Sequence, residues 1–376
     1  MVSTSYSSLM SKQIGIAGTL LMFCSMLTWA ESAPVFSLTY TGDAFQNVSG
    51  GIRTGSEYLD LVEVSVETDF VLSDSWVLST SIQGLHSNGH SITERLAGDV
   101  QVLSSLDGGG SFTKLGQATV ELSTSALSLL FGLYDINAEF DVLESASLFV
   151  NSAHGIGSDI ALTGENGPSI YPFYSLGGRM KLTIDNNQSI KLALLDAVPG
   201  STTSFNAPQP EFDSEDGLFA IAEYAYSTAH NKWLFGGWGY SKTIEVNSRQ
   251  TRNIGANVRH EHQFKDQRTR AFFRIGYAYE HANLHDWFLS GGINYVDPFN
   301  VGTEDVVGIA IAHLLRGAKS ESELLSANHP ETAFELTYLR IINQHFYVQP
   351  NIQYIENSGF EDRHALVAGI RLHLSL

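Results

Sequence analysis

Short segments in which apolar and polar side chains alternate follow one another from Tyr58 to the end of the chain. Each is about ten residues long or shorter and is bounded by turn residues. The clearest of these segments are 62–67, 180–184, 190–194, 273–280, 334–338, 346–354 and 366–376. Strict alternation turns one face of a segment towards an apolar medium, which is the pattern of a β-strand. The chain is therefore predicted to be all-β.

One pair of segments indicates how the strands connect. Segments 180–184 and 190–194 carry apolar residues at every second position, and Asp185-Asn186-Asn187-Gln188 lies between them. Two alternating runs joined by a short polar turn are typical of an antiparallel hairpin with one apolar face.

Two features favour a membrane barrel over a soluble β-sandwich, which shows the same alternation. Aromatic residues crowd the ends of the apolar faces, as in the girdles of membrane barrels. They are Trp233, Trp238, Tyr240, Tyr277, Tyr279, Trp287, Phe288, Tyr338, Phe346 and Tyr354. The last segment also alternates up to Leu376, where outer-membrane barrels carry an assembly signal, although leucine replaces the usual terminal aromatic residue. We therefore expect a transmembrane antiparallel β-barrel.

The first 30 residues have a different character. Lys12 precedes an apolar stretch over 14–27, and Thr28-Trp29-Ala30 follows, which is typical of a signal peptide cleaved after Ala30. The apolar stretch is shorter than the roughly 20 residues that a spanning helix needs. We expect a signal peptide at 1–30, an N-terminal segment leading into the barrel at 31–57, and the barrel at 58–376. Its length allows about 14 to 18 strands around a water-filled lumen.

Composition excludes several classes of protein. The chain is 43% hydrophobic and 11% aromatic, so it has enough apolar surface to fold. Its net charge of −19 argues against nucleic acid, whose phosphates need a basic surface. The single cysteine, Cys24, lies in the expected signal peptide, so neither a disulfide framework nor a cysteine metal site is expected.

Collinear motifs over some 330 residues resemble the OprB-type carbohydrate-selective porins. The most specific are Phe131-Gly132-Leu133-Tyr134-Asp135-Ile136-Asn137-Ala138-Glu139-Phe140 and Leu148-Phe149-Val150-Asn151-Ser152-Ala153-His154-Gly155-Ile156. Others in the family's order are 47–55, 98–101, 104–107, 171–173, 176–177, 198–200, 215–219, 222–224, 304–309, 348–355 and 369–371. The chain departs from the family where a Tyr-Glu-x-Trp strand is replaced by 116–121 and where a Gly-Tyr pair is replaced by 255–257. These departures put the sugar preference in doubt.

The resemblance implies sixteen strands, a bacterial outer-membrane location and passive diffusion of neutral, glucose-like sugars. Its implied partners are carbohydrate solutes, outer-membrane lipid and the barrel-assembly machinery, with no nucleic acid and no cofactor. It favours a monomer and leaves an oligomer open. Two further functions of a membrane barrel stay open. One is a general porin without sugar preference, and the other is a structural or adhesive barrel without solute flux. A soluble periplasmic carbohydrate-binding or glycoside-cleaving β-protein is the alternative from another class.

Polar side chains on the inward face are the candidates for contact with solute. A sugar exchanges water for hydrogen bonds and moves on only if those bonds are numerous and individually weak. Gln349, Asn351 and Gln353 form an amide ladder with donors and acceptors. Charges of both signs would orient a dipolar neutral solute. The charged candidates are Glu63, Glu67, Lys181, Lys191, Glu223, Arg274, Glu280, Glu335 and Arg371. Each is equally a solvated wall residue of any wide barrel.

Other chemistry finds little support in the sequence. His260-Glu261-His262 and the pair His281 and His285 lack a third metal ligand. No carboxylate pair stands out as a glycosidase site, and there is no phosphate-binding loop or nucleophile elbow. We therefore expect neither enzyme activity nor a metal. The stretch from Asn151 to Pro172 is long for a hairpin connection, so it is either an external loop or a constriction inside the lumen.

Overall fold

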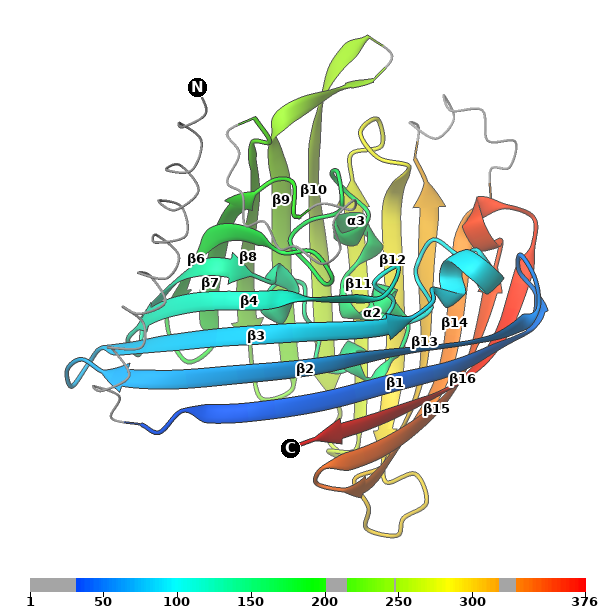
Figure 1. The fold of residues 1–376 in the computed structure, drawn as a ribbon, viewed down its shortest axis with the longest axis horizontal. Helices are drawn as coiled ribbons and strands as arrows, with labels where there is room; N and C mark the ends of the chain where they lie inside the picture. Colours follow the sequence, from blue (N-terminus) through cyan, green and yellow to red (C-terminus); the bar gives the residue numbers. More distant parts are fainter. Residues whose placement is uncertain (1–31, 201–214, 247, 318–328) are drawn as a thin grey trace, which may run out of the picture.

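The computed structural model describes residues 32–200, 215–246, 248–317 and 329–376. They form sixteen antiparallel strands that close into one barrel (Figure 1). The strands are β1 (Val35–Gly50), β2 (Gly55–Val71), β3 (Val77–Gly89), β4 (Phe112–Ser123), β5 (Leu127–Tyr134), β6 (Ser175–Thr183), β7 (Gln188–Asp196), β8 (Leu218–Ser227), β9 (Asn231–Val246), β10 (Arg249–Gln263), β11 (Thr269–Ala278), β12 (His285–Val296), β13 (Val306–Arg316), β14 (Glu331–Asn343), β15 (Phe346–Glu356) and β16 (His364–Ser375). The predicted architecture and strand number are confirmed.

Each strand pairs with its neighbours in sequence, and β1 closes the ring against β16. In this closing pair Thr39 lies opposite Ser375 and Phe45 opposite Gly369. Closure leaves no unpaired edge, and this is the condition for a sheet to cross a membrane. None of the helices in the described ranges has the length and apolar character needed to cross a membrane.

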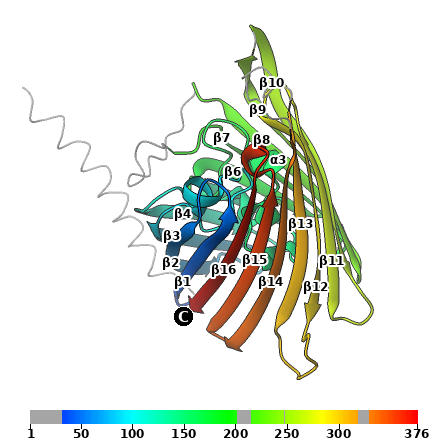
Figure 2. The ribbon, with the colours of Figure 1, turned by 90° about the vertical axis from the view of Figure 1, so that its right-hand side faces the viewer.

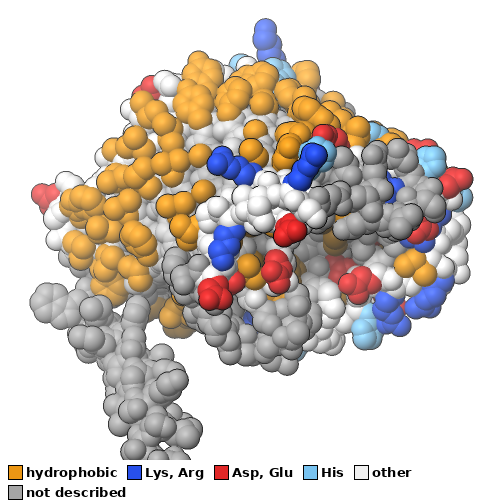
Figure 3. Space-filling view, turned by 90° about the horizontal axis from the view of Figure 1, so that it is seen from above, with side chains coloured by type: hydrophobic (Ala, Val, Ile, Leu, Met, Phe, Trp, Pro, Cys, Tyr) orange, Lys and Arg blue, Asp and Glu red, His pale blue; other side chains and the backbone are white. Residues whose placement is uncertain are grey.

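The apolar positions of the alternating segments face outwards, as predicted. Met180 and Leu192 of the predicted hairpin, Ile275, Leu336 and Ile370 are all exposed on the outside of the barrel, while the residues between them face the lumen. Viewed from above, hydrophobic side chains crowd along the outer side of the molecule (Figure 3). This outer band is the surface expected of a barrel in lipid.

The barrel begins earlier than expected. Strand β1 lies within the stretch 31–57 that we had assigned to a segment before the barrel at 58–376. Its outward positions include Gly42 and Gln46, and this breaks the apolar alternation that marks the other strands. Backbone pairing to both β2 and β16 nevertheless makes β1 a full member of the wall. The expected signal peptide at 1–30 lies outside the described residues.

Connections at one end of the barrel are short, and several at the other end are long. The turn between β14 and β15 spans 344–345, whereas 90–111 joins β3 to β4 and 135–174 joins β5 to β6. We call these two long connections the first and second inserted segments. The first contains η2 (Thr93–Ala97), and the second contains η3 (Ile136–Ala138), η4 (Ala146–Leu148), α2 (Ser152–Gly155) and α3 (Ser158–Ala161). A further turn, η5 (Ser358–Phe360), joins β15 to β16.

Candidate functional site

The second inserted segment folds into the lumen. Both views place α3 within the ring of strands (Figures 1 and 2), and α3 contacts β11 and β12. Further along the wall, the Glu335 carboxylate of β14 accepts hydrogen bonds from the backbone N–H groups of Val150 (2.8 Å) and Asn151 (3.0 Å). The Asn151 amide donates to Gln353 of β15 (3.0 Å). The stretch from Asn151 to Pro172 is thus a constriction rather than an external loop, and the inserted part starts before it, at 135.

A buried network of charges holds the same segment against β10 and β11. Asp141 of the segment lies 3.1 Å from the Arg259 guanidinium and 3.3 Å from that of Arg274. Arg274 also donates to the carbonyl oxygens of Ala153 (2.9 Å) and Asp141 (2.7 Å). Arg259 in turn pairs with Glu223 of β8. Buried charges are tolerated only when they are paired in this way.

Two titratable side chains in this region have no hydrogen-bond partner. Both carboxylate oxygens of Asp159 and both ring nitrogens of His154 are buried and unpaired. Burial, with the charge of Asp141 added, raises the pKa of Asp159 to about 7, although Arg274 opposes the shift. Burial and the neighbouring Arg274 lower the pKa of His154 to about 3. A neutral carboxyl and a neutral imidazole therefore fit this interior at mildly acid pH.

The first inserted segment fills the lumen on the side of β1, β14 and β16. Glu331 of β14 accepts hydrogen bonds from the backbone N–H groups of Val100 and Gln101, each at 2.9 Å. Asp43 of β1 accepts two hydrogen bonds from Arg371 of β16 (2.8 and 2.7 Å) and one from Ser104 of the segment (2.6 Å). Apolar residues of the segment pack here against inward side chains of the wall.

These segments cover most of the candidates for solute contact. All of the covered residues face inwards as predicted, but they are buried: Glu223, Arg274, Glu335, Gln349, Asn351, Gln353 and Arg371. In the amide ladder, Gln349 donates to the carbonyl oxygen of Leu148, and Gln353 donates to that of Leu103 (2.8 Å). We expected the ladder and these charges to be candidates for contact with solute, but the inserted segments cover them in this structure. Hydrogen bonds or ion pairs of all but Asn351 link them to the inserted segments.

Other candidates remain open to the lumen. Glu67 and Lys181 are exposed, and Glu63 is half-buried and accepts hydrogen bonds from Thr39 (3.1 Å) and Gln83 (3.0 Å). Lys191, in contrast, is mostly covered, because its ammonium group lies 2.7 Å from the buried Glu223 and donates to the carbonyl oxygen of Glu139 in the second inserted segment. Contact of these residues with solute stays a prediction.

Glu280 is not on the barrel wall. It follows the end of β11 at Ala278, in the connection to β12, where its carboxylate lies 3.7 Å from His281. The alternation of segment 273–280 continues past the last paired residue, and for this reason the sequence placed Glu280 on the strand.

Sequence reasoning missed several residues that shape the lumen. Arg179 of β6 is 3% exposed and lies 2.6 Å from Glu139 of the second inserted segment and 3.5 Å from Glu121 of β4. Its inward direction follows from extending the alternation of segment 180–184 by one residue. Asp141 and Glu139 carried no such signal, because they lie in a connection without periodicity.

The open part of the wall carries separated charges. Strand register places Glu67 of β2 beside Ser81 of β3 and Thr119 of β4. The neighbouring row runs from Asp69 through Ser79 and Glu121 to Leu130 and then to Arg179. The second row thus joins acids of β2 and β4 to the buried Arg179 of β6, with the Ser79 hydroxyl and the Leu130 side chain also in the row. Such a surface offers both hydrogen-bond donors and acceptors to a polar solute.

The histidines considered as metal ligands lie elsewhere. His260 and His262 are on the outward face of β10, where both contact Asn231 and the His260 ring lies 4.1 Å from that of Trp233. In the described ranges, no group of three or more potential ligands lies close enough together to hold a metal ion. The absence of a cofactor stays a prediction.

Comparison with known families identifies the chain. The sequence model of the family described as "Carbohydrate-selective porin, OprB family" matches residues 62–241 and 237–376, which is most of the chain. The chain belongs to the OprB family. An OprB-family chain is a porin for carbohydrates, and the closed sixteen-strand barrel fits a channel for sugars. The predicted family and function are confirmed.

Solved structures agree on the fold. One is titled "High pH structure of Pseudomonas putida OprB", with a TM-score of 0.79, 17% identity, and coverage of 94% of this chain and 96% of that chain. A mutant of the Rh. blastica porin has a TM-score of 0.58 at 12% identity, with 91% and 100% coverage. OmpT of Vibrio cholerae has a TM-score of 0.57 at 11% identity, with 92% and 99% coverage. A search of curated proteins found no match.

Proposed function

We propose that this OprB-family porin lets neutral, glucose-sized sugars diffuse passively through the bacterial outer membrane. The observation that carries the proposal is the partial filling of the lumen. Two inserted segments cover most of the inner wall. Solute therefore passes beside the polar residues that stay open towards the short-turn ends of β2 to β6, among them Glu67 and Lys181. A narrowed path with donors, acceptors and both signs of charge favours small neutral polyols over large or strongly charged solutes.

The contacts with solute are assigned to the open residues. Glu67 presents its carboxylate beside Ser81 and Thr119 of the wall, and Glu63 lies on the same strand. Lys181 presents its ammonium group on β6, and the mostly covered Lys191 lies on β7. Each hydrogen bond to a sugar hydroxyl replaces one to water, so the net gain is small and release stays fast. The protein then works without catalysis, as a channel rather than an enzyme.

The setting of the channel is also part of the proposal. The apolar outer band and outward aromatics such as Trp287 and Tyr354 suit outer-membrane lipid, with insertion by the barrel-assembly machinery. Three aromatics expected at the membrane interfaces instead face inwards and are covered: Trp238, Tyr240 and Phe288. A monomer is proposed on the family resemblance alone.

Liposome swelling with the purified mature protein tests the proposal. Entry of glucose is compared with that of amino acids and simple ions of similar size. Faster entry of sugar at matched size supports a carbohydrate-selective channel. Equal entry of all solutes would indicate a general porin, and no entry would revive a structural or binding role. Heat-dependent mobility on gels controls for assembly, and extraction without detergent would point to a soluble protein.

A further inference from the structure

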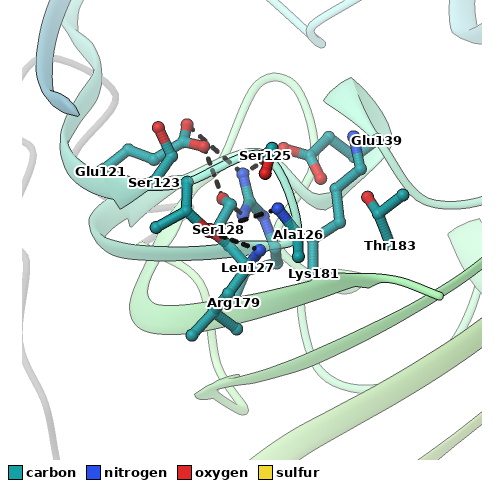
Figure 4. Close-up of a pocket in the computed structure, with 11 residues that line it drawn as sticks. Glu121, Ser123, Ser125, Ala126, Leu127, Ser128, Glu139, Arg179, Lys181 and Thr183 are labelled. Atoms are coloured by element: carbon teal, nitrogen blue, oxygen red, sulfur yellow. Dashed lines mark hydrogen bonds and ion pairs between the residues drawn. The ribbon is translucent and has the colours of Figure 1, made fainter. Parts of the chain in front are cut away.

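The open wall contains a pocket of about 380 Å³, a volume in the range of about 300 to 1,000 Å³ typical of small-molecule sites. Its walls come from the end of β4, the turn at 124–126, the start of β5, strand β6 and the second inserted segment. Glu121 and Ser123 lie on one side, and Lys181, Thr183 and Glu139 lie on the other (Figure 4).

The pocket lies at the end of the barrel with the short turns. The β4–β5 turn that borders it spans only 124–126, and the C-terminus of β16 emerges at the same end. In outer-membrane barrels the short turns face the periplasm. A solute that enters from outside would therefore meet this pocket after passing the inserted segments, as it leaves the channel for the periplasm.

The polar groups of the pocket are only partly used by the protein. Arg179 pairs with Glu121 and Glu139 and donates to Ser128. Its Nε and the Oε2 atom of Glu139 are nevertheless buried without a hydrogen-bond partner. Lys181 forms no ion pair within the part of the chain that the structure describes. The group that the pocket offers to a solute without an ion-pair partner is therefore the exposed Lys181 ammonium, which lies in the same pocket as the Thr183 and Ser123 hydroxyls.

We propose that this pocket is a subsite for one neutral hexopyranose at the periplasmic mouth of the channel. A sugar hydroxyl both donates and accepts, so the hydroxyls of one ring can accept from the Lys181 ammonium on one side of the pocket and donate to the Glu121 carboxylate on the other. Two carboxylates and two cations balance in charge, and this favours a neutral solute over an ion of either sign. The inference rests on the proposed function.

The chemistry of the pocket also predicts weak binding. No aromatic ring lines it, so a pyranose gains hydrogen bonds without a stacking platform. Each charge-assisted hydrogen bond to the sugar replaces one to water, so its net contribution to the binding free energy is modest. A conducting channel needs such a site, because a solute must leave as readily as it enters.

Single-channel current recordings with glucose added to one side at a time test the subsite. In the wild type, glucose from the short-turn side should interrupt the current at lower concentration than glucose from the other side. Lys181→Met, which keeps the length of the side chain without its charge, should raise the half-blocking concentration from the short-turn side by about three- to tenfold. Ser125→Ala, in the turn, is a second pocket variant that does not alter a strand.

Lys265→Ala serves as the matched control, because it removes one exposed lysine from the β10–β11 turn at the same end of the barrel. It should leave the half-blocking concentration unchanged. If glucose blocks the wild type but Lys181→Met and Ser125→Ala behave like the control, the subsite is refuted while the sugar channel stands. If the wild type neither admits glucose in swelling assays nor shows any block, the proposed function fails and the subsite fails with it.

Discussion

At the scale of single residues, buried carboxylates act as acceptors for backbone N–H groups of the inserted segments. Glu335 and Glu331 each receive two or more such hydrogen bonds from segments far away in the chain. A carboxylate has two oxygens and can accept from two neighbouring amides at once, and its negative charge strengthens both hydrogen bonds.

Replacing Glu335 by glutamine tests this role. The amide offers one oxygen instead of two, so one of the Val150 and Asn151 N–H groups loses its acceptor. The free energy of local opening should fall by about 1 to 3 kcal/mol, and hydrogen exchange at these two amides should accelerate about 5- to 150-fold. Glu361→Gln, at an exposed position, is the control. Unchanged exchange in both variants would contradict the assigned role.

The Asp43–Arg371 pair makes a second prediction at this scale. Arg371→Ala leaves the Asp43 carboxylate buried without its partner, which should lower the free energy of unfolding by about 3 to 5 kcal/mol. Denaturant unfolding in detergent, followed by tryptophan fluorescence, measures the change. Arg270→Ala removes an exposed arginine of β11 and should lower the free energy of unfolding much less than Arg371→Ala does. Equal stability of the two variants would show that the pair contributes nothing beyond a surface charge.

At the scale of elements, the second inserted segment contains several buried polar atoms that have no hydrogen-bond partner. Asp159 of α3 faces Arg274 and Arg259 across Asp141, and its oxygens have no hydrogen bonds. Gly276 of β11 lies directly against it, where an added Cβ would come within 2.1 Å of the carboxyl carbon. The tight fit leaves no space to solvate a carboxylate, so α3 packs best when Asp159 is neutral.

This packing predicts a pH dependence of the constriction. The pKa of Asp159 in the folded protein, about 7, lies above its ordinary value of 3.8. The protonated Asp159 carboxyl therefore stabilises the packing of α3 fully below about pH 4, and this stabilisation is lost as the pH rises through about 7. Fluctuations of the open-channel current should increase between pH 5 and pH 8. Asp159→Asn, which stays neutral, should flatten this dependence, and an equally steep profile in the variant would assign it to another group.

At the scale of the whole molecule, the two faces of one sheet meet different media. The outer face is apolar around the described barrel, while most of the inner face is covered by the inserted segments and stays polar and open only towards the short-turn ends of β2 to β6. An asymmetric filling of this kind narrows the channel without reducing the number of strands.

Ile275→Arg tests the orientation of the wall. Ile275 is exposed on the outside of β11, and an arginine near the middle of the bilayer costs about 2 to 4 kcal/mol. The variant should assemble poorly, which heat-dependent mobility on gels would reveal. Asn186→Arg, in the exposed β6–β7 turn, should assemble normally. Normal assembly of Ile275→Arg would mean that this face of β11 does not contact lipid.

The amino-acid pattern alone was sufficient to predict the β class, the direction of most strand side chains and the family. Alternation is a local property, because successive residues of a strand point to opposite faces whatever their neighbours are. Inward directions of Arg371 and Gln353 were therefore predictable from their own segments. This reasoning failed in two places. The alternation continues past the last paired residue of β11, so Glu280 was placed on the strand, and a glycine and a glutamine on the outward face of β1 hid that strand.

Which inward side chains meet water became clear from the folded barrel and could not be predicted from the pattern. Glu335 and Val150 are separated by 185 positions in the chain, and Gln353 and Leu103 by 250. Val150 and Leu103 lie in the two inserted segments, which have no periodicity from which these contacts could be predicted. Whether a lumen residue faces solute or a covering segment depends on how a connection folds back after the barrel has closed, and that is fixed by contacts between distant parts of the chain.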